Sequence, residues 1–324
     1  MTGPATTTAA ASIWRRRILI IANPAAGRSW LRRRRLDRIV AALRRRGCTV
    51  VLRQSGPTPG DVERLAREAE TDFEVIVAAG GDGTINAIAN GLANGIAEGI
   101  AKGIGGSARP IAILPFGTAN VLAHEIGLPR NAEALAEMIA AGPVQAIRPG
   151  MVDGRLFLTM ASTGFDAETV ATVDPRLKRW LGRLAFVWAI LLRLLSYRDC
   201  TLTVAVDGVT HRAATVVASR GKLYAGPYVI ASEADLAAPI LHLVLLRRSG
   251  RLAVLRYLAA LLSGQIARRD DVVTLRAQRA TVSCSSAVRV QADGEPTGRL
   301  PATFAVAEQP LRLVHPIPAA DANV

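Results

Sequence analysis

A glycine-rich segment near residue 80 has the composition expected of a phosphate-binding turn. Gly80, Gly81, Asp82, Gly83 and Thr84 lie between an apolar run and a helix-forming run, so the order is strand, turn, helix. Backbone N–H groups in such a turn approach a phosphate closely, because glycine has no Cβ in the way. Asp82 has the wrong charge for a phosphate and fits only if a metal ion, a water or a hydroxyl lies between them. The segment therefore predicts a nucleotide site with Mg²⁺.

Two other polar segments follow predicted strands. Asn23 follows the first strand, and residues 117–120, Gly-Thr-Ala-Asn, follow strand 111–114. Thr118 and Asn120 can offer a hydroxyl and an amide to phosphate or ribose. Ligands of parallel α/β sheets bind at the carboxyl ends of the strands, so these segments are expected to face one site.

The elements that position these residues divide at about residue 147. Strands at 17–22, 48–52 and 75–79 alternate with helices, which predicts a parallel sheet with right-handed crossovers over residues 17–147. Residues 148–303 show short alternating segments, with several Asp-Gly turns between them, and indicate an antiparallel β domain. Two helices interrupt that domain, at 175–197 and 251–262. Residues 1–16 are interpreted as a disordered lead-in.

Composition limits the choice of partner. The chain has 324 residues and a net charge of +14, which favours an anionic partner such as phosphate, nucleic acid or an acidic membrane surface. Its basic patches are not interleaved with stacking aromatics, so no nucleic-acid partner is expected. The arginines at 32–35 and 44–46 are interpreted as a solvated helix face, with a membrane role as the alternative. Isolated histidines show no metal-ligand spacing.

The expected location is cytoplasmic. The three cysteines are scattered and odd in number, which suits a reducing compartment. The first residues lack the pattern of a signal peptide, and no apolar run reaches the length needed to cross a bilayer. A glycine-rich near-repeat at 90–105 makes a poor helix and is interpreted as a low-complexity expansion of a loop or helix end, without a function.

Five motifs together carry a family resemblance. The Gly-Gly-Asp-Gly-Thr turn alone occurs in NAD kinases, phosphofructokinase-like enzymes and diacylglycerol kinases. The order and spacing of all five match the third group, and the chain resembles bacterial lipid kinases of the diacylglycerol kinase catalytic-domain and sphingosine kinase superfamily over residues 17–316. The motifs are Asn23-Pro24 with Gly27, residues 80–84, residues 117–120, Gly-Phe-Asp-Ala at 164–167 and Asp-Gly-Glu-Pro at 293–296.

The resemblance implies a fold and a reaction. The fold is an NAD kinase/diacylglycerol kinase-like α/β domain with a parallel sheet, followed by an antiparallel β-sandwich that binds lipid. Residues 304–316 would return to the first domain. The reaction is ATP-dependent transfer of the γ-phosphate to a hydroxyl of diacylglycerol or a similar long-chain lipid alcohol, in a cleft between the domains. Related enzymes form dimers, so a homodimer is also expected.

The same resemblance implies a role for each matching residue. Asp82 would hold Mg²⁺, directly or through water. Asp293 would be the general base on the lipid hydroxyl, with Glu295 beside it, and a carboxylate in hydrogen-bond reach can take that proton. The residues expected on the nucleotide are Asn23, Gly27, Gly80, Gly81, Gly83, Thr84, Gly117, Thr118 and Asn120.

The segment 178–188 fits access to a lipid. Trp180 and Trp188 are aromatics of the interfacial type, and the basic residues around them suit anionic headgroups. A core helix packed on the β domain is the alternative, and one helix can have both roles. Peripheral contact with an anionic membrane surface is therefore expected.

Two departures from the family pattern bear on metal binding. Val121 stands where many members have an aspartate, so one carboxylate that could join the Mg²⁺ network is missing. Ala238, Pro239 and His242 replace the Asp, Gly and Asp of a loop that binds a structural metal in many members, so that site is expected to be absent. These losses keep open the alternative of a non-catalytic nucleotide- or lipid-binding relative. An NAD kinase-like soluble kinase is a separate alternative, and the motif at 117–120 and the basic apolar helix count against it.

Overall fold

The computed structural model describes residues 14–24, 30–101, 109–172, 183–196 and 200–318. Gly27, residues 1–13 and residues 178–182 of the lipid-access segment lie outside these ranges. Arg15 belongs to the predicted lead-in but is buried, and its guanidinium donates hydrogen bonds to the carbonyl oxygens of Ile139 (3.0 Å) and Gly142 (2.7 Å). The folded part of the chain therefore begins before residue 17.

The first domain is built on a six-stranded sheet. Its order is β2-β1-β3-β4-β20-β5, and all neighbours are parallel except the β20–β5 pair. The predicted α/β domain with a mostly parallel sheet is thus confirmed. The strands are β1 (Arg17–Ala22), β2 (Thr49–Gln54), β3 (Val75–Gly80), β4 (Ile111–Pro115), β5 (Val144–Ile147) and β20 (Leu311–Val314).

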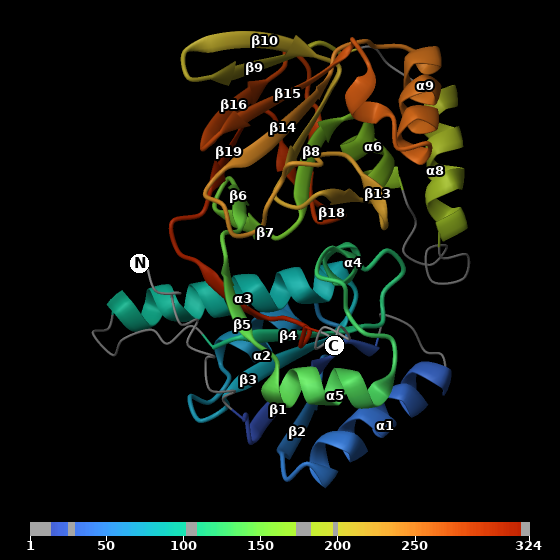
Figure 1. Ribbon diagram of the computed structural model, residues 1–324. Helices are drawn as coiled ribbons and strands as arrows, with labels where there is room; N and C mark the ends of the chain where they lie inside the picture. The colour runs from blue at the N-terminus through green and yellow to red at the C-terminus, as the bar shows by residue number, and fades with distance from the viewer. Residues whose placement is uncertain (1–13, 25–29, 102–108, 173–182, 197–199, 319–324) are drawn as a thin grey trace, which may run out of the picture.

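Helices cover both faces of this sheet (Figure 1). Side chains alternate between the two faces of a strand, so Ile18 and Ile20 of β1 pack with α1 and α5, while Leu19 and Ile21 pack with α2 and α3. Because both faces are covered, the central strands are almost continuously apolar. The helices are α1 (Trp30–Arg45), α2 (Asp61–Arg67), α3 (Asp82–Ala101), α4 (Val121–Glu125) and α5 (Ala132–Ala141).

The glycine-rich repeat forms the end of a helix as far as Ala101, so of the two interpretations, loop or helix end, the structure has the helix end. Helix α3 includes residues 90–101 of the repeat, and residues 102–105 lie outside the described residues. A Cβ at Gly91 would lie 2.2 Å from the carbonyl oxygen of Glu63, so glycine is required where α3 crosses α2. Gly95, one turn further along the same face, lies beside Arg67 of α2. The close packing of two helices explains the glycines that made this segment look like a poor helix.

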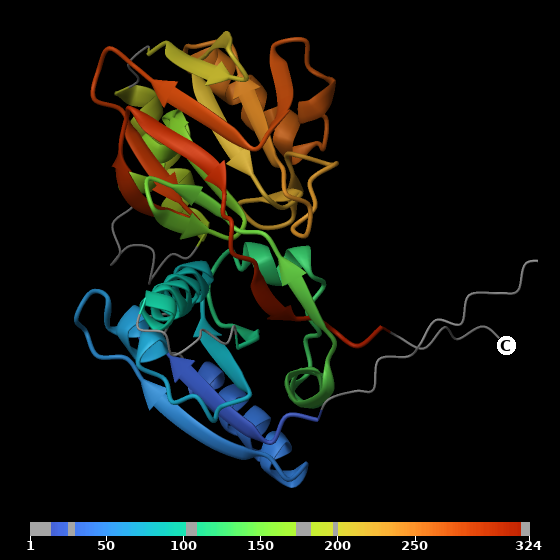
Figure 2. The same cartoon turned by 90° about the vertical axis from the view of Figure 1, so that its left-hand side faces the viewer.

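The second domain is an antiparallel β-sandwich, as predicted (Figure 2). Its two sheets have the orders β10-β9-β16-β19-β6-β7 and β15-β14-β11-β8-β17-β18, and their facing side chains form one core around Phe157 and Phe304. The strands of the first sheet are β6 (Gly150–Val152), β7 (Arg155–Phe157), β9 (Leu202–Val206), β10 (Val209–Ala213), β16 (Arg279–Ser283) and β19 (Ala302–Val306). Those of the second are β8 (Met160–Gly164), β11 (Thr215–Ser219), β14 (Leu241–Leu246), β15 (Val272–Ala277), β17 (Arg289–Ala292) and β18 (Glu295–Arg299).

Helices cover the outer face of the second sheet. Helix α9 (Arg251–Leu262) packs on it through Tyr257 and Leu261, against Met160, Val217 and Val244. Helix α6 (Phe165–Thr172) packs against α8 (Arg183–Leu195), and the Arg251 side chain at the start of α9 donates to the carbonyl oxygen of Leu195 at the end of α8 (2.7 Å; Figure 1). The remaining elements are the pair β12 (Leu223–Tyr224) and β13 (Tyr228–Val229) and the short helix η2 (Ile266–Arg268). None of the described helices is long and apolar enough to cross a membrane.

The chain crosses between the domains twice. The first crossing lies between β5 and β6, that is, between Ile147 and Gly150. The second lies between β19 and β20 and returns the chain to the first sheet. The return is shorter than the predicted 304–316, because residues up to Val306 still pair with β6 and β16 in the sandwich.

Candidate active site

Two glycine-containing turns meet at the carboxyl ends of neighbouring strands. Residues 81–84 follow β3 and residues 116–120 follow β4, and the two strands pair in parallel up to Gly80 and Pro115. A Cβ built on Gly117 would lie 2.4 Å from the Cα of Gly81, so the two backbones touch. Any side chain at Gly117 would force the turns apart, and this contact brings the two predicted nucleotide motifs into one site.

Asn23 joins this site from β1. Its amide nitrogen lies 3.4 Å from the Oγ1 of Thr84, at the weak limit of a hydrogen bond. Thr84 is buried and fills the space above Gly80, where a Cβ would lie 2.2 Å from that Oγ1. Gly80 is therefore needed to seat the threonine.

Asn120 builds its turn. It has a left-handed backbone (φ 49°), its Oδ1 accepts from the N–H of Gly117 (2.9 Å), and its Nδ2 donates to the carbonyl oxygen of Gly117 (3.0 Å). Both ends of the amide are thus used inside the turn, which leaves Thr118 as the residue of this motif that brings a polar side chain to the cavity described below. Direct contact of Asn120 with a nucleotide stays a prediction.

Asp82 starts α3 and is half-buried beside the first turn of α4. The N–H of Leu122 donates to its Oδ1 (3.4 Å), and the neighbouring backbone N–H groups of Val121 and Asn120 also favour its charged form. Burial and, second, the negative charge of Asp293 outweigh these donors and raise the pKa of Asp82 to about 6. Asp82 therefore changes charge close to neutral pH, as carboxyl groups at reacting centres often do.

Asp293 occupies a tight hairpin turn between β17 and β18. Asp293 and Gly294 both have positive φ (48° and 83°), as the Asp-Gly sequence predicts for a two-residue turn. The backbone of Asp293 forms the predicted turn, while its carboxylate is buried and points into the protein. The two predictions for this residue, a hairpin turn and a site carboxylate, are therefore compatible.

Five hydrogen bonds hold the Asp293 carboxylate. Its Oδ1 accepts from the N–H (2.9 Å) and Oγ1 (2.7 Å) of Thr159 and from the N–H of Met160 (3.1 Å). Its Oδ2 accepts from the N–H of Leu158 (2.7 Å) and the Nδ2 of Asn86 (2.8 Å). A carboxylate has about four lone-pair positions, so these five donors occupy both oxygens. This geometry is that of a fixed anion, and a proton from a lipid hydroxyl would have to displace one of the donors.

Glu295 is exposed and lies against the first turn of α3. A Cβ at Gly83 would lie 2.9 Å from its Oε1, so Gly83 leaves room for this carboxylate. Glu295 thus comes from the second domain and reaches the turn that the sequence assigns to phosphate.

Asp166, in the first turn of α6, is a site carboxylate that the predicted set omitted. It accepts hydrogen bonds from the hydroxyls of Tyr224 and Ser162 and from the Nε2 of Gln291 (3.1 Å). Burial and the charge of Asp166 raise the pKa of Tyr224 well above its ordinary value, so Tyr224 stays a neutral donor. The signal was present in the Gly-Phe-Asp-Ala motif, where Asp166 is equally compatible with a helix cap.

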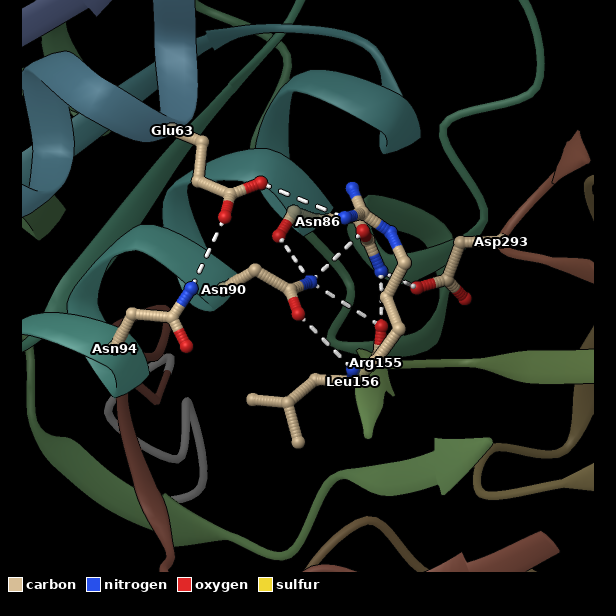
Figure 3. A network of polar contacts seen from close by, with 7 residues as sticks. All are labelled: Glu63, Asn86, Asn90, Asn94, Arg155, Leu156 and Asp293. Carbon is tan, nitrogen blue, oxygen red and sulfur yellow. Dashed lines mark hydrogen bonds and ion pairs between the residues drawn. The ribbon is translucent and has the colours of Figure 1, made fainter. Parts of the chain in front are cut away.

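A row of asparagines on α3, the helix that follows the glycine turn, connects the first domain to Asp293 and Leu156 of the second (Figure 3). Asn86 donates to the carbonyl oxygen of Leu156 (2.8 Å) as well as to Asp293. Asn90 accepts from the N–H of Leu156 (3.0 Å) and so pairs with the edge of β7. Asn94, exposed and one turn further, donates to the half-buried Glu63 within the first domain (3.0 Å). This role was not predicted from the sequence, although asparagine at every fourth position indicates one helix face.

One cavity of about 1270 Å³ is lined both by the glycine turns of the first domain and by Asp293 and Glu295 of the second. At one end it is lined by Asn23, Gly81, Asp82, Gly83, Thr84, Gly117 and Thr118, together with Arg32, which the sequence interpretation left on a solvated face. Asp166, Asp293 and Glu295 also line it. The rest is mainly apolar, from the sheet and from α8 and α9: Met160, Val217, Leu246, Ile190, Leu191, Leu194, Val254, Leu255, Leu258, Leu261 and Leu262. It is larger than the 300–1,000 Å³ typical of small-molecule pockets.

The donor set near Asp82 fits a magnesium ion that arrives with a nucleotide. Among the described residues no three His, Cys, Asp or Glu side chains converge to hold a metal by themselves. Mg²⁺ usually keeps several waters and is bound through one or two carboxylates plus substrate phosphates. Asp82 offers such a carboxylate, and a nearby cation would lower its raised pKa.

Each of the two domains matches the model of a known protein family. Residues 17–152 match the model for the diacylglycerol kinase catalytic domain, and residues 159–315 match that for the YegS C-terminal NAD kinase beta sandwich-like domain. A diacylglycerol kinase of Bacillus subtilis (strain 168) is 27% identical over 306 residues, covering 93% of this chain and 97% of that protein. A YegS-like lipid kinase of Pseudomonas aeruginosa is 34% identical over 158 residues, 48% of this chain and 47% of that protein.

Solved structures share the fold. Two from Bacillus anthracis str. Sterne superpose with TM-scores of 0.75 and 0.68, at 20% and 18% identity, and cover 96% and 93% of this chain and 98% and 97% of theirs. The second of them is described as a diacylglycerol kinase. The two matched domains, in this order and over almost the whole chain, show that the protein belongs to the diacylglycerol kinase catalytic-domain superfamily of lipid kinases.

Proposed function

We propose that this protein transfers the γ-phosphate of ATP to a hydroxyl of diacylglycerol or a similar long-chain lipid alcohol. The observation that carries the proposal is the shape of the cavity, because a single space reaches from the glycine turns, past Asp82, to the apolar surface between α8 and α9. A water-soluble acceptor such as a dinucleotide has no use for that apolar surface. The names of the relatives agree with a lipid acceptor.

The residues of the first domain would bind the nucleotide. The N–H groups of Gly81 and Gly83 and the Thr118 hydroxyl would face the phosphates, and Arg32 lines the same cavity with a positive charge. Mg²⁺ bound with ATP would neutralise charge on the transferring phosphoryl group. Asp82 would orient that ion through its carboxylate or an intervening water.

Asp82, rather than Asp293, is the carboxylate that we assign to the acceptor proton. Its pKa is about 6 in the protein without a cation, so it is a charged carboxylate at neutral pH. A Mg²⁺ ion held through an intervening water would leave its oxygens free to take the proton. Asp293 has its oxygens occupied by five donors, and its negative charge is the second cause of the raised pKa of Asp82. In this proposal Asp293 tunes Asp82 and holds β8 and α3 in place.

The mouth of the apolar end would contact an anionic membrane surface. The outer faces of α8 and α9 expose large apolar side chains, and exposed arginines lie on and beside α9. Apolar side chains with a basic rim suit a bilayer that carries anionic lipid. The apolar residues are Trp188, Leu191, Leu192, Leu195, Leu252, Leu255 and Leu262, and the arginines are Arg247, Arg248, Arg251 and Arg256.

A transfer assay tests the function. Purified protein is incubated with labelled ATP, Mg²⁺ and a panel of lipids in mixed micelles, beside Asp82→Asn and the matched control Asp207→Asn, an exposed aspartate of another Asp-Gly turn. We expect labelled lipid from the wild type and the control and none from Asp82→Asn. Label on NAD would instead favour an NAD kinase-like enzyme, and ATP binding without transfer to any acceptor would favour a non-catalytic relative.

A further inference from the structure

Arg220 is a fully buried cation at the junction of the two domains. It directly follows β11 and has no exposed surface. Its guanidinium donates to five backbone carbonyl oxygens, with Nε donating to Arg148 (2.6 Å) and Nη2 to Leu236 (3.0 Å) and more weakly to Asp235 (3.4 Å). The carbonyl oxygens of Ala238 and Ile240 complete the set. We call these five oxygens the carbonyl cage.

The cage holds a positive charge without a carboxylate in direct contact. The Asp235 side chain is used within its own loop, where Oδ1 accepts from the N–H of Ala237 (2.9 Å). Burial lowers the pKa of Arg220 to about 10, against the opposing charge of Asp235, so its guanidinium remains charged at neutral pH. Carbonyl dipoles directed at one point are also an arrangement by which proteins bind hard cations such as Ca²⁺.

The cage lies in the loop for which the family resemblance implies a structural metal in many members. Its oxygens come mainly from residues 235–240, and with Ala238 and His242 in place of two aspartates the loop lacks the two carboxylates that the resemblance implies for a metal. A divalent ion does not fit the residues present, because the guanidinium already occupies the carbonyl oxygens and would repel it.

The cage also ties both crossings between the domains. The N–H of Arg148, in the first crossing, donates to the carbonyl oxygen of Leu236 (2.8 Å). The Arg148 side chain donates to the carbonyl oxygen of Glu308, in the second crossing (2.9 Å). On its other side, the N–H of Arg220 donates to the carbonyl oxygen of Thr159, which in turn holds Asp293. Arg220 therefore lies between the domain junction and the site, with its side chain bound at the junction and its backbone N–H bound to Thr159.

We propose that Arg220 is a built-in cation that takes the place of a bound metal ion, and that the carbonyl cage is a cation site which accepts a free guanidinium ion once the arginine side chain is removed. The proposal concerns folding at the junction and does not depend on which reaction the protein catalyses.

Thermal unfolding of the full chain without nucleotide tests it. We expect the wild type to unfold at the same temperature in EDTA and in Mg²⁺, and Arg220→Met to unfold roughly 5 °C or more lower, because the carbonyl oxygens lose their donors. Arg220→Lys, which keeps the charge but has fewer donors, should lie between the two. A lower unfolding temperature of the wild type in EDTA, or an Arg220→Met variant as stable as the wild type, would overturn the proposal.

Chemical rescue separates a charge site from ordinary packing. Arg220→Ala in millimolar methylguanidinium should recover part of the lost unfolding temperature, whereas the neutral, similarly shaped urea at the same concentration should not. The wild type, whose cage is filled, should respond to neither. If Arg220→Ala does not fold, Arg220→Lys still has to exceed Arg220→Met. Equal effects of methylguanidinium and urea would contradict a cation site.

Discussion

The negative charge of Asp293 helps to raise the pKa of Asp82, although the two carboxylates come from different domains and lie more than two hundred residues apart in the sequence. Their surroundings are opposite. Asp293 is buried and accepts five hydrogen bonds, while Asp82 is half-buried beside the first turn of α4. The two carboxylates therefore have different roles in the cavity. Asp293 is held in place by its donors, and Asp82 is the carboxyl group whose pKa lies near neutral pH.

Replacement of Asp82 by asparagine should abolish transfer and stabilise the fold. The folded protein keeps the Asp82 proton up to about pH 6, whereas the unfolded chain releases it near the ordinary value of 3.8. The free energy of unfolding of the wild type therefore falls as pH rises between these values and stays lowered above them. The introduced amide cannot ionise, so Asp82→Asn should be more stable than the wild type by about 1–2 kcal/mol at pH 7.5, discounted for its partial exposure.

Thermal unfolding of both proteins between pH 4 and pH 8 checks this. The difference in unfolding temperature should be small at pH 4 and grow up to about pH 6. A difference that does not change with pH would mean that the asparagine acts through packing alone. Asp207→Asn is the matched control, because Asp207 is exposed.

Replacement of Asp293 by asparagine distinguishes a tuning anion from a general base. Removal of its charge should lower the pKa of Asp82, so the acid limb of the pH–rate profile should move to lower pH while measurable transfer remains. The amide nitrogen introduced by Asp293→Asn would face backbone donors, so we also expect a loss of about 2–4 kcal/mol in stability. Complete loss of transfer at every pH, in protein that is still folded, would return the role of base to Asp293.

The three Asp-Gly turns show how far the sequence predicts this site. Asp153, Asp207 and Asp293 all adopt the expected left-handed turn, because that choice depends on local backbone geometry. Local pattern does not distinguish the exposed Asp207 from the buried Asp293. That difference arises from Thr159 and Asn86, which reach Asp293 across 134 and 207 residues of sequence.

Helix α3 illustrates the other limit of prediction. Its strand–turn–helix origin was predictable from the apolar strand and the glycines that follow it. The role of its asparagines was not, because their partner Leu156 belongs to the second domain. Arg220 was equally hidden, since its five partners are backbone oxygens, which no side-chain motif records.

The asparagine row predicts a graded mutational effect along one helix face. Asn86→Ala removes a donor to both Asp293 and Leu156 at buried positions and should lower stability by about 1–3 kcal/mol and reduce kcat. Asn94→Ala, two turns away on the same face, removes an exposed bond to Glu63 and should change either quantity little. Denaturant unfolding and transfer kinetics of the two variants test this, and equal losses would show that α3 is sensitive along its whole length.

Membrane contact through α8 and α9 should depend on individual exposed leucines. Leu195 and Leu252 are 72% and 60% exposed and lie outside the set that lines the cavity. Replacement of either by glutamine should weaken binding to vesicles of phosphatidylcholine with phosphatidylglycerol by roughly 10-fold, given about 1.5–3 kcal/mol for a buried leucine. Leu31→Gln, on the first domain and 67% exposed, is the matched control. Equal weakening by the control, or unchanged sedimentation with vesicles, would argue against this face.

The two glycines of α3 that face α2 should respond in opposite directions to alanine. A Cβ at Gly91 would lie 2.2 Å from the carbonyl oxygen of Glu63, so Gly91→Ala must push the helices apart and should destabilise the first domain by about 1–3 kcal/mol. A Cβ at Gly95 would lie 3.4 Å from the carbonyl oxygen of Arg67, which is an ordinary contact. Gly95→Ala should then be neutral or gain up to about 1 kcal/mol from helix propensity. If denaturant unfolding showed the two variants to be equally stable, close helix packing could not be the reason for glycine at position 91.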